Sequence, residues 1–364
     1  MREEIFMHYA ARLELLRHLL ASLPCDALLI EHPTHLLYLT GLELSAGKLL
    51  VTQQNACLIV DGRYIERSSV QTLYPAQLLQ ENSLKGLLMG YQIHQLGFDM
   101  HQTTYHTFLK LTQLAVDLKS QSYAIDIVPV ESPVQQLRLI KDEDEISRLR
   151  SAALLGYQGY EFVVSLLREG ITEAEIAFEL EFFWKKRGAS HLAFESIIAF
   201  GPNSSMPHYR AGQTKLQLHT SVLIDIGVVL SHYHSDMTRV AFFGTPPPII
   251  QEIYSIVEEA KARALALCRP GTLIGELDSI AREWIASKGY NDYFTHSLGH
   301  GIGLDIHEPP IVRKIGPYST TPLQAGMVLT IEPGIYLPEV GGVRLEDTVL
   351  ITEKGYDNLT IPKT

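Results

Sequence analysis

Cysteine is scarce in this sequence, and its few occurrences do not form a recognisable framework. Cys25, Cys57 and Cys268 are far apart along the chain and odd in number. No CxxC pair is present, which argues against a zinc ribbon as well as against a disulfide-stabilised fold. We therefore expect a protein of a reducing compartment, with the cytoplasm as the default.

Positive charge and long apolar runs are also in short supply. The chain has 30 lysine and arginine residues against 41 aspartate and glutamate residues, a net charge of −11. This balance argues against nucleic acid or anionic lipid as a partner, but it is compatible with a metal cation. No apolar run approaches the roughly 20 residues that span a bilayer. The N-terminal segment MREEIFMHYAARLELLRHLL lacks the charged-then-apolar order of a signal peptide, so we expect no membrane association.

What is present is an ordinary globular composition, 46% hydrophobic and 20% charged, in a chain long enough for two domains. After an opening helix, CDALLIE, HLLYLTG, KLLVTQQ and NACLIVDG are typical of strands, TTYHTFLKLTQLAVDL of a helix and IDIVPVESPV of a further strand. This alternation predicts a compact α/β domain over residues 1–134. With a boundary near Pro133, a second domain is expected over residues 135–364.

The second domain has the spacing of an internal repeat. A long helical segment is followed by TEAE, a capping-box pattern, and by a second helix. The intervals Gly170 to Gly188 and Gly271 to Gly289 are both 18 residues long, and Trp184 and Trp284 occupy nearly equivalent places within them. Helices of this length are common, so spacing alone is compatible with coincidence. Because strand-like segments follow each interval, we expect a duplicated helix–helix–sheet domain.

Four acidic residues interrupt apolar, strand-like runs in this domain. Asp225 lies in VLIDIGVVL and Asp236 in HSDMTRVAFF, 11 residues apart, whereas Glu332 in VLTIEPG and Glu346 in VRLEDTVL are 14 apart. An unpaired charge is costly to bury, so each of these carboxylates needs a compensating partner. A hairpin in each half would bring the two members of each pair together.

The segment HSLGHGIGLDIHEPP places His296, His300 and His307 among glycines. The first two have the spacing of an HExxH zinc motif, but no glutamate follows the first, and the glycines would weaken a helix, so we expect an extended or looping segment. Four acids and a histidine predict one shared site whose charge two divalent cations would balance. An oxygen-rich set with a single imidazole suits Mn²⁺, Co²⁺ or Fe²⁺, and two such ions together can activate a water molecule.

Each of these residues has a simpler interpretation when it is taken alone. An acid within a strand is more often paired with an arginine, and Arg239 and Arg344 are available as partners. A single histidine is more often a satisfied core residue than a ligand. The metal hypothesis therefore depends on the set and not on any one member.

The order of the motifs resembles that of a known family. DIG, YHSDMTR, HSLGHGIGLDIHE, TIEPGIY and GGVRLEDTV resemble the signature of the M24 metallopeptidases, and HLLYLTG with ACLIVDGRY resembles the creatinase/prolidase N-terminal domain. The resemblance covers nearly the whole chain and is nearest to the Xaa-Pro aminopeptidases and Xaa-Pro dipeptidases. It implies an α/β N-terminal domain followed by an α+β catalytic domain of the pita-bread (creatinase/aminopeptidase-like) fold, with an internal pseudo-twofold repeat.

The same resemblance implies a set of ligands for two divalent metal ions, with manganese expected and cobalt, iron or zinc as alternatives. The implied ligands are Asp225, Asp236, His300, Glu332 and Glu346. Within this set Asp236 and Glu346 would bridge both ions, Asp225 would complete one, and His300 with Glu332 would complete the other. The middle histidine of the glycine-rich segment is therefore the expected ligand.

Catalytic roles are implied for five residues. Glu332 would move a proton from water to the leaving nitrogen, and His307 with His208, in MPHYR, would stabilise the oxyanion. His296 and Arg344 would lie near the substrate.

The implied function is removal of the N-terminal residue from small peptides with proline in the second position, by a cytoplasmic homodimer. An Xaa-Pro dipeptidase (prolidase) is the alternative, because no residue in the sequence decides between the two. Creatinase shares the architecture without a metal, and some pita-bread proteins are non-catalytic peptide-binding proteins that have lost the ligands. The five ligand types present here argue against both. Methionine aminopeptidase shares the ligands but usually lacks an N-terminal domain of this kind.

Overall fold

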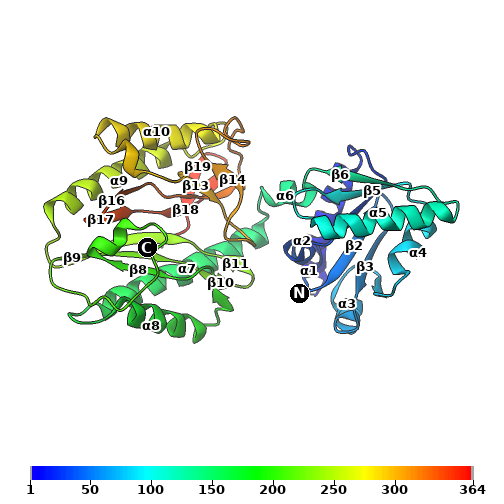
Figure 1. The fold of residues 1–364 in the computed structure, drawn as a ribbon, viewed down its shortest axis with the longest axis horizontal. Coiled ribbons are helices and arrows are strands. Elements are labelled where there is room, and N and C mark those ends of the chain that lie inside the picture. Colours follow the sequence, from blue (N-terminus) through cyan, green and yellow to red (C-terminus); the bar gives the residue numbers. More distant parts are fainter. Residues whose placement is uncertain (1, 362–364) are drawn as a thin grey trace. The chain divides into compact units, whose positions relative to one another are not determined.

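The chain folds into two compact units, which are described one at a time. The computed structural model describes residues 2–361, with side chains from Met7 onward. The N-terminal unit ends at Arg138 and the C-terminal unit begins at Leu139 (Figure 1). None of the helices within the described range is long and apolar enough to cross a membrane.

The N-terminal unit is built on a six-stranded mixed sheet in the order β4-β3-β2-β1-β5-β6. Strand β1 is parallel to β5 on one side and antiparallel to β2 on the other, and β5 is parallel to β6. The elements of this unit are α1 (Arg2–Leu20), β1 (Ala27–Ile30), α2 (Pro33–Thr40), β2 (Gly47–Thr52), β3 (Ala56–Val60), α3 (Ile65–Gln71), β4 (Ala76–Leu78), α4 (Ser83–Gly90), β5 (Gln95–Asp99), α5 (Tyr105–Ser120), β6 (Asp126–Val130) and α6 (Pro133–Arg138).

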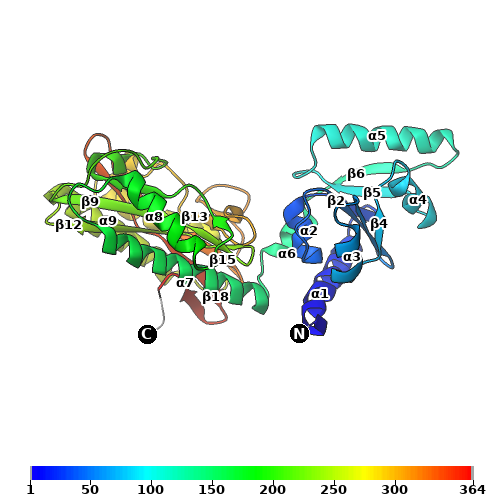
Figure 2. The same ribbon diagram turned by 90° about the horizontal axis from the view of Figure 1, so that it is seen from below.

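Helices lie on both faces of this sheet. Figure 2 shows α5 along one face, with α1, α2 and α3 on the other. Leu111 and Leu118 of α5 pack with Leu50 and Leu96 of the sheet in one buried cluster. Burial of one apolar face of each helix against the sheet stabilises this α/β arrangement, which is the one that the alternating pattern predicts.

The prediction of a strand for HLLYLTG is wrong, because this segment forms most of helix α2. Pro33 is at the first helical position, where its missing N–H costs nothing, and Gly41 ends the helix with a left-handed φ of 72°. Leu36 and Leu39 point into the core at helical spacing. The two terminators and this spacing outweigh the apolar, strand-like composition of the segment.

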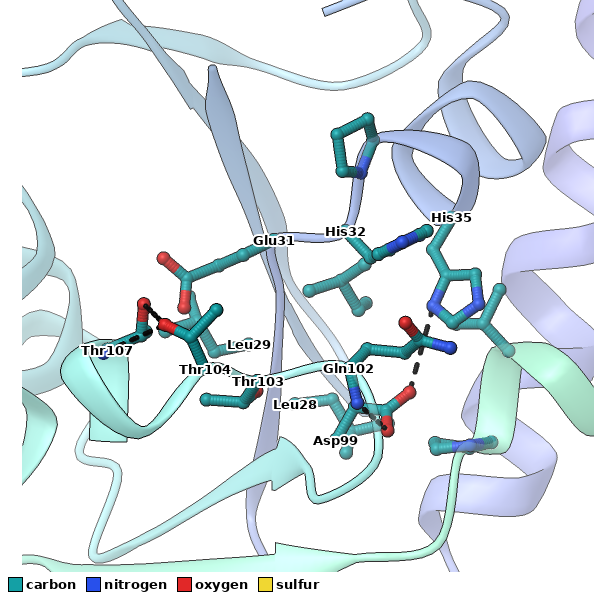
Figure 3. A pocket seen from close by; sticks show the side chains of 14 residues that line it. Leu28, Leu29, Glu31, His32, His35, Asp99, Gln102, Thr103, Thr104 and Thr107 are labelled. Carbon is teal, nitrogen blue, oxygen red and sulfur yellow. Dashed lines mark hydrogen bonds and ion pairs between the residues drawn. The ribbon is translucent and has the colours of Figure 1, made fainter. Parts of the chain in front are cut away.

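A cavity of about 240 Å³ lies at the carboxyl ends of β1 and β5. Asp99, the last residue of β5, accepts the backbone N–H groups of His101 and Gln102 with one carboxylate oxygen. Its other oxygen lies 3.8 Å from Nδ1 of His35 (Figure 3). Thr104, also at this cavity, caps the N-terminus of α5. These contacts fix the loop that follows β5.

The C-terminal unit consists of two halves, each with a pair of helices followed by strands. The first half contains α7 (Glu143–Leu166), α8 (Glu173–Lys185), β7 (His191–Leu192), β8 (Ile197–Phe200), η1 (Gly201–Ser205), β9 (Thr220–Ile226), β10 (Val228–Leu230), β11 (Tyr233–His234) and β12 (Met237–Phe243). The second contains α9 (Pro248–Ala266), α10 (Ile274–Ser287), η2 (Asn291–Tyr293), β13 (Gly299–Gly301), β14 (Glu308–Val312), β15 (Val328–Ile331), β16 (Gly334–Leu337), β17 (Gly341–Arg344), β18 (Asp347–Thr352) and β19 (Gly355–Asn358). The main sheets run in the orders β12-β9-β8 and β14-β13-β15-β18-β19.

The two halves repeat one another in detail. Trp184 of α8 donates its indole N–H to the carbonyl oxygen of Leu155 on α7 at 2.9 Å, and Trp284 of α10 donates to Ile256 on α9 at 3.1 Å. Each indole therefore joins the two helices of its own half. The predicted helix–helix–sheet duplication is confirmed.

The turns between the paired helices also correspond. Gly170 and Gly271 have left-handed φ values of 84° and 90°, which favour glycine. Their N–H groups donate at 2.9 Å to the carbonyl oxygens of Leu216 and Leu323 respectively. In the first half the predicted TEAE capping box is present: the side chain of Thr172 accepts the backbone N–H of Glu175, and the backbone N–H of Thr172 donates to the Glu175 carboxylate.

The halves meet along the strands that carry the acidic residues. The backbone N–H of Glu346, just before β18, donates to the carbonyl oxygen of Thr238 on β12 at 3.0 Å. The hydroxyl of Thr348 on β18 donates to the carbonyl oxygen of Asp236 at 2.9 Å. These bonds hold the N-terminal end of β12 against the N-terminal end of β18.

Candidate active site

The four acids that interrupt apolar runs lie at corresponding ends of paired strands. In the first half Asp225 of β9 is opposite Thr238 of β12, and Asp236 directly precedes β12. In the second half Glu332 follows β15 and Glu346 precedes β18, at the paired ends of these two antiparallel strands. A short hairpin, β10–β11 or β16–β17, separates the members of each pair. The two acids of each half are thus brought together by the same local topology.

His300, the middle histidine of the glycine-rich segment, faces these acids from the centre of β13. Its Nδ1 lies 3.0 Å from the carbonyl oxygen of Gly301, so Nδ1 carries the proton and Nε2 presents a lone pair. Nε2 is 3.6 Å from a carboxylate oxygen of Asp236 and 3.6 Å from one of Glu332. Asp236, His300 and Glu346 offer ligand atoms that all lie within 4.8 Å of one another.

Two glycines allow β13 to approach its neighbours this closely. A Cβ on Gly299 would lie 1.9 Å from the carbonyl oxygen of Thr330, and a Cβ on Gly301 would lie 2.2 Å from that of Pro309. Backbone atoms cannot yield to such contacts without moving the strands apart. The glycines on either side of His300 therefore let it reach the acids from within the sheet.

Burial and mutual repulsion shift the pKa values of the carboxyl groups upward. Burial is the largest cause of a pKa of Asp236 well above its usual range, and the charge of Glu346 adds to it. Burial and the charge of Glu346 likewise raise the pKa of Glu332, and burial with the charge of Asp225 raises that of Glu346 to about 7. Burial lowers the pKa of His300 to about 4, so its ring is neutral at pH 7. Negative charge on these buried carboxyl groups is therefore not fully compensated by the protein.

One arginine compensates part of that charge. Asp225 accepts a hydrogen bond from Arg344 with Oδ2, at 2.5 Å, whereas its buried Oδ1 has no hydrogen-bond partner among the described residues. A buried carboxylate oxygen is costly unless a donor or a cation reaches it. With carboxylate oxygens and one neutral imidazole as donors, this site fits divalent cations of the harder kind.

Two family models together match most of the chain. The model of metallopeptidase family M24 matches residues 147–353, and the model of the creatinase/prolidase N-terminal domain matches residues 12–140. The chain is also 36% identical to an Xaa-Pro dipeptidase from Pyrococcus horikoshii, with 92% of each chain covered. The chain belongs to metallopeptidase family M24.

Solved structures agree with this membership. The fold of this M24 metallopeptidase is similar to that of an Xaa-Pro dipeptidase from Bacillus anthracis, with 34% identity, a TM-score of 0.89 and 98% and 99% of the two chains covered. It is also similar to an X-Pro aminopeptidase from Thermotoga maritima, with 32% identity, a TM-score of 0.84 and 94% and 98% covered. The predicted creatinase-type N-terminal domain and pita-bread catalytic domain are confirmed, as is the assignment to the metallopeptidases.

A cavity of about 520 Å³ in this M24 metallopeptidase opens onto the acids. All the residues that the sequence singles out as ligands or catalytic groups line it: Asp225, Asp236, Glu332, Glu346, His208, His296, His300, His307 and Arg344. Residues separated by more than a hundred positions therefore contribute to one wall.

The other two histidines of the glycine-rich segment each lie beside a predicted ligand, His307 beside His300 and His296 beside Glu332. The ring of His307 stands edge-on to that of His300, with their centroids 4.3 Å apart. Nδ1 of His296 is 4.0 Å from a carboxylate oxygen of Glu332. Burial, followed by the charge of Arg344, lowers the pKa of His296 to about 4, so this ring is neutral at pH 7.

Two further residues at the site are not singled out by the sequence. The Tyr336 hydroxyl lies 2.8 Å from Nε2 of His296 and accepts a hydrogen bond from Arg344 at 2.7 Å, and burial raises its pKa to about 12. The Thr238 hydroxyl donates to Glu346 at 2.9 Å and accepts from Nε of Arg344 at 3.2 Å. Tyrosine and threonine are ordinary strand residues, so their types alone carry no functional signal.

Proposed function

We propose that this M24 metallopeptidase removes the N-terminal residue from peptides with proline in the second position, with two divalent ions, manganese expected, as cofactors. The observation that carries the proposal is the buried cluster of Asp236, His300 and Glu346, whose ligand atoms lie within 4.8 Å of one another. The unpartnered Oδ1 of Asp225 supports the same site. The residues that would hold the ions are Asp225, Asp236, His300, Glu332 and Glu346.

The protein side chains supply the proton transfers and the orientation of the peptide. Bound divalent ions would lower the pKa of a water molecule and polarise the scissile carbonyl. Glu332 lies at the cavity with its side chain 17% exposed, so its carboxylate can accept a proton from water and return it to the leaving nitrogen. That return is required because the nitrogen of a peptide bond must gain a proton before it can leave as an amine.

Histidines on the cavity wall have a separate role in the proposal. His208 and His307 line the cavity and can donate N–H groups to the oxygen that becomes negative during attack. Burial lowers the pKa of His307, so its ring can donate a hydrogen bond without carrying a positive charge. Arg344 keeps one oxygen of Asp225 occupied, which leaves the other available to a cation.

The charges that line the cavity favour an aminopeptidase over a dipeptidase. A dipeptidase must bind the free carboxylate of proline, one residue from the scissile bond, and a cation is the usual partner for such a group. Among the lining residues, Arg344 is already bonded to Asp225, and Arg210 lies 3.4 Å from Glu195 with most of its side chain in solvent. Ile311 adds an apolar, partly exposed surface to the wall. A longer peptide needs no cation at this place.

The second candidate is an Xaa-Pro dipeptidase. The relatives from Pyrococcus horikoshii and Bacillus anthracis carry that name and match over nearly the full length of the chain. If the enzyme is a dipeptidase, Arg210 would have to exchange Glu195 for the carboxylate of the substrate.

Cleavage of matched peptides tests the proposal and separates the candidates. The protein is stripped of metal and assayed with Ala-Pro and Ala-Pro-Ala, before and after addition of Mn²⁺ and, separately, Co²⁺. Metal-dependent cleavage of both peptides, or of Ala-Pro-Ala alone, supports the aminopeptidase. Cleavage of Ala-Pro alone supports the dipeptidase. Failure to cleave either peptide with either ion contradicts the proposed substrate class.

A further inference from the structure

Glu173, the first residue of helix α8, is a charged side chain with no solvent exposure at all. It is not part of the capping box, which uses its neighbours Thr172 and Glu175. It also does not line the cavity of the candidate active site. A fully buried carboxylate is costly to maintain, so its bonding partners indicate what it does.

Among the described residues, four groups donate to Glu173, and all come from one segment, residues 200–212, which begins at the end of β8 and leads toward β9. Its Oε1 accepts the backbone N–H of Phe200 at 2.8 Å and the side-chain amide of Asn203 at 2.9 Å. Its Oε2 accepts the hydroxyl of Tyr209 at 2.8 Å and the backbone N–H of Gly212 at 3.1 Å. The carboxylate thus holds both ends and the middle of the segment. The positive N-terminal end of α8 adds to the stabilisation of its charge.

The same segment carries His208 to the cavity. His208 is exposed, and no hydrogen bond to its ring occurs within the described part of the chain. The position of the imidazole therefore depends on the backbone on either side of it. Tyr209, the next residue, donates its hydroxyl directly to Glu173.

We infer that Glu173 is a positioning residue, which holds the 200–212 segment so that His208 faces the reacting carbonyl. This inference deepens the proposed function and rests on the role given there to His208. The carboxylate acts at a distance from the substrate, through the Tyr209 hydroxyl and the backbone of the segment. Displacement of a catalytic group by about 1 Å can lower a rate a hundredfold, so rigid attachment of this segment matters for the reaction.

Glu173→Gln is the variant that tests the inference. An amide keeps the shape but offers only one accepting oxygen, so its NH₂ group must face two of the four donors, and part of the segment is released. We expect kcat/KM with Ala-Pro-Ala to fall about tenfold to a hundredfold, while the bound metal content is unchanged. Glu175→Gln is the matched control: it changes an acid in the same helical turn whose carboxylate, among the described residues, bonds only to Thr172, and it should leave kcat/KM within about twofold.

A double-mutant cycle distinguishes positioning from a general loss of structure. If Glu173 acts through His208, the double variant Glu173→Gln/His208→Ala should be no slower than His208→Ala alone, within about twofold. Multiplication of the two single effects would overturn the inference, because it would mean that Glu173 acts independently of His208.

A spectroscopic readout keeps the inference testable even if His208 has no catalytic role. The imidazole resonance of His208, assigned by its loss in His208→Ala, should shift or broaden in Glu173→Gln and not in Glu175→Gln. An unchanged resonance in Glu173→Gln would overturn the positioning role. Full activity of His208→Ala would instead contradict the role proposed for that histidine and leave the resonance to decide about Glu173.

Discussion

Arg344 shows how much one residue can hold in place at this site. Its guanidinium bonds to Asp225 on β9, to Tyr336 on β16 and to Thr238 on β12, so it joins three strands besides its own. The sequence presents it as one available partner for an acid. Its bonds to Tyr336 and Thr238 depend on strands that meet only in the folded chain, which is why neither partner could be predicted with it.

The substitution Arg344→Met should therefore cost stability in a metal-dependent way. It leaves the buried carboxylate of Asp225 without its counter-charge, and the loss of one partner of a buried pair typically costs about 3–5 kcal/mol. With Mn²⁺ bound the loss should be smaller, because cations compensate the same charge. Urea unfolding with and without Mn²⁺ measures both values; equal losses in the two conditions would contradict a cation next to Asp225.

Two histidines four residues apart should behave differently when each is removed. His300→Ala should lower both metal content and activity, because Nε2 of this ring faces Asp236 and Glu332. His296→Ala should keep the metal but lower the rate, because that ring bonds to Tyr336. Metal analysis of the two purified variants decides: loss of metal in His296→Ala with retention in His300→Ala would reverse the assignment. Asp236→Ala, which removes a proposed ligand at the centre of the cluster, should lower both metal content and activity.

At the scale of elements, the start of α8 could be predicted from its capping box, whereas the helical state of the apolar segment HLLYLTG could not. TEAE specifies the start of α8 through bonds between neighbouring residues, so the sequence contains all that is needed. HLLYLTG is mostly apolar, and its helical state depends on Pro33 at the first helical position, on Gly41 directly after the last, and on packing against the sheet. The glycines around His300 correctly excluded a helix. The reason that glycine is needed at Gly299 is the close approach of the Thr330 carbonyl, which lies about thirty residues away in the sequence and could not be predicted.

The glycines of β13 make a prediction about that strand. Gly299→Ala should destabilise the protein by about 3 kcal/mol and lower metal content, since the new methyl group would collide with the carbonyl of Thr330 and displace His300. Gly355→Ala on β19 is the matched control, because a Cβ there meets nothing within 4 Å. Urea unfolding and metal analysis measure both effects. Similar behaviour of the two variants would show that β13 tolerates a side chain.

The stability of the metal-free protein should depend on pH, and metal binding should abolish this dependence. Glu346 has a pKa of about 7 in the fold, above its ordinary value of 4.5, so the folded protein binds a proton that the unfolded chain releases. Such a group stabilises the fold at low pH and loses this contribution as the pH rises through about 7. The raised pKa values of Asp236 and Glu332 act in the same direction.

The buried histidines act oppositely, but only at lower pH. His296 and His300 have pKa values of about 4, below their ordinary 6.5, so they titrate below pH 6.5. From pH 6.5 to about pH 8 the free energy of unfolding of the metal-free protein should therefore fall, by up to about 1.4 kcal/mol per pH unit for each proton released. The metal-loaded protein should not show this fall. Urea unfolding across this range checks both; a flat or rising curve for the metal-free protein contradicts the prediction.

The duplication of the C-terminal unit has a consequence for how the molecule opens. Each half brings a pair of acids to the line where β12 meets β18, and neither half has the full donor set by itself. Divalent cations bound there would hold together the two halves of the C-terminal unit, each of which has its own helices and sheet. Without the ions, these buried carboxyl groups lose their cation partners and Asp225 keeps only Arg344, so the contact between the halves is weaker, while Trp184 and Trp284 still join the helices within each half. After metal removal, amide hydrogen exchange should therefore become faster first in β12 and β18, and only later in the helices of either half.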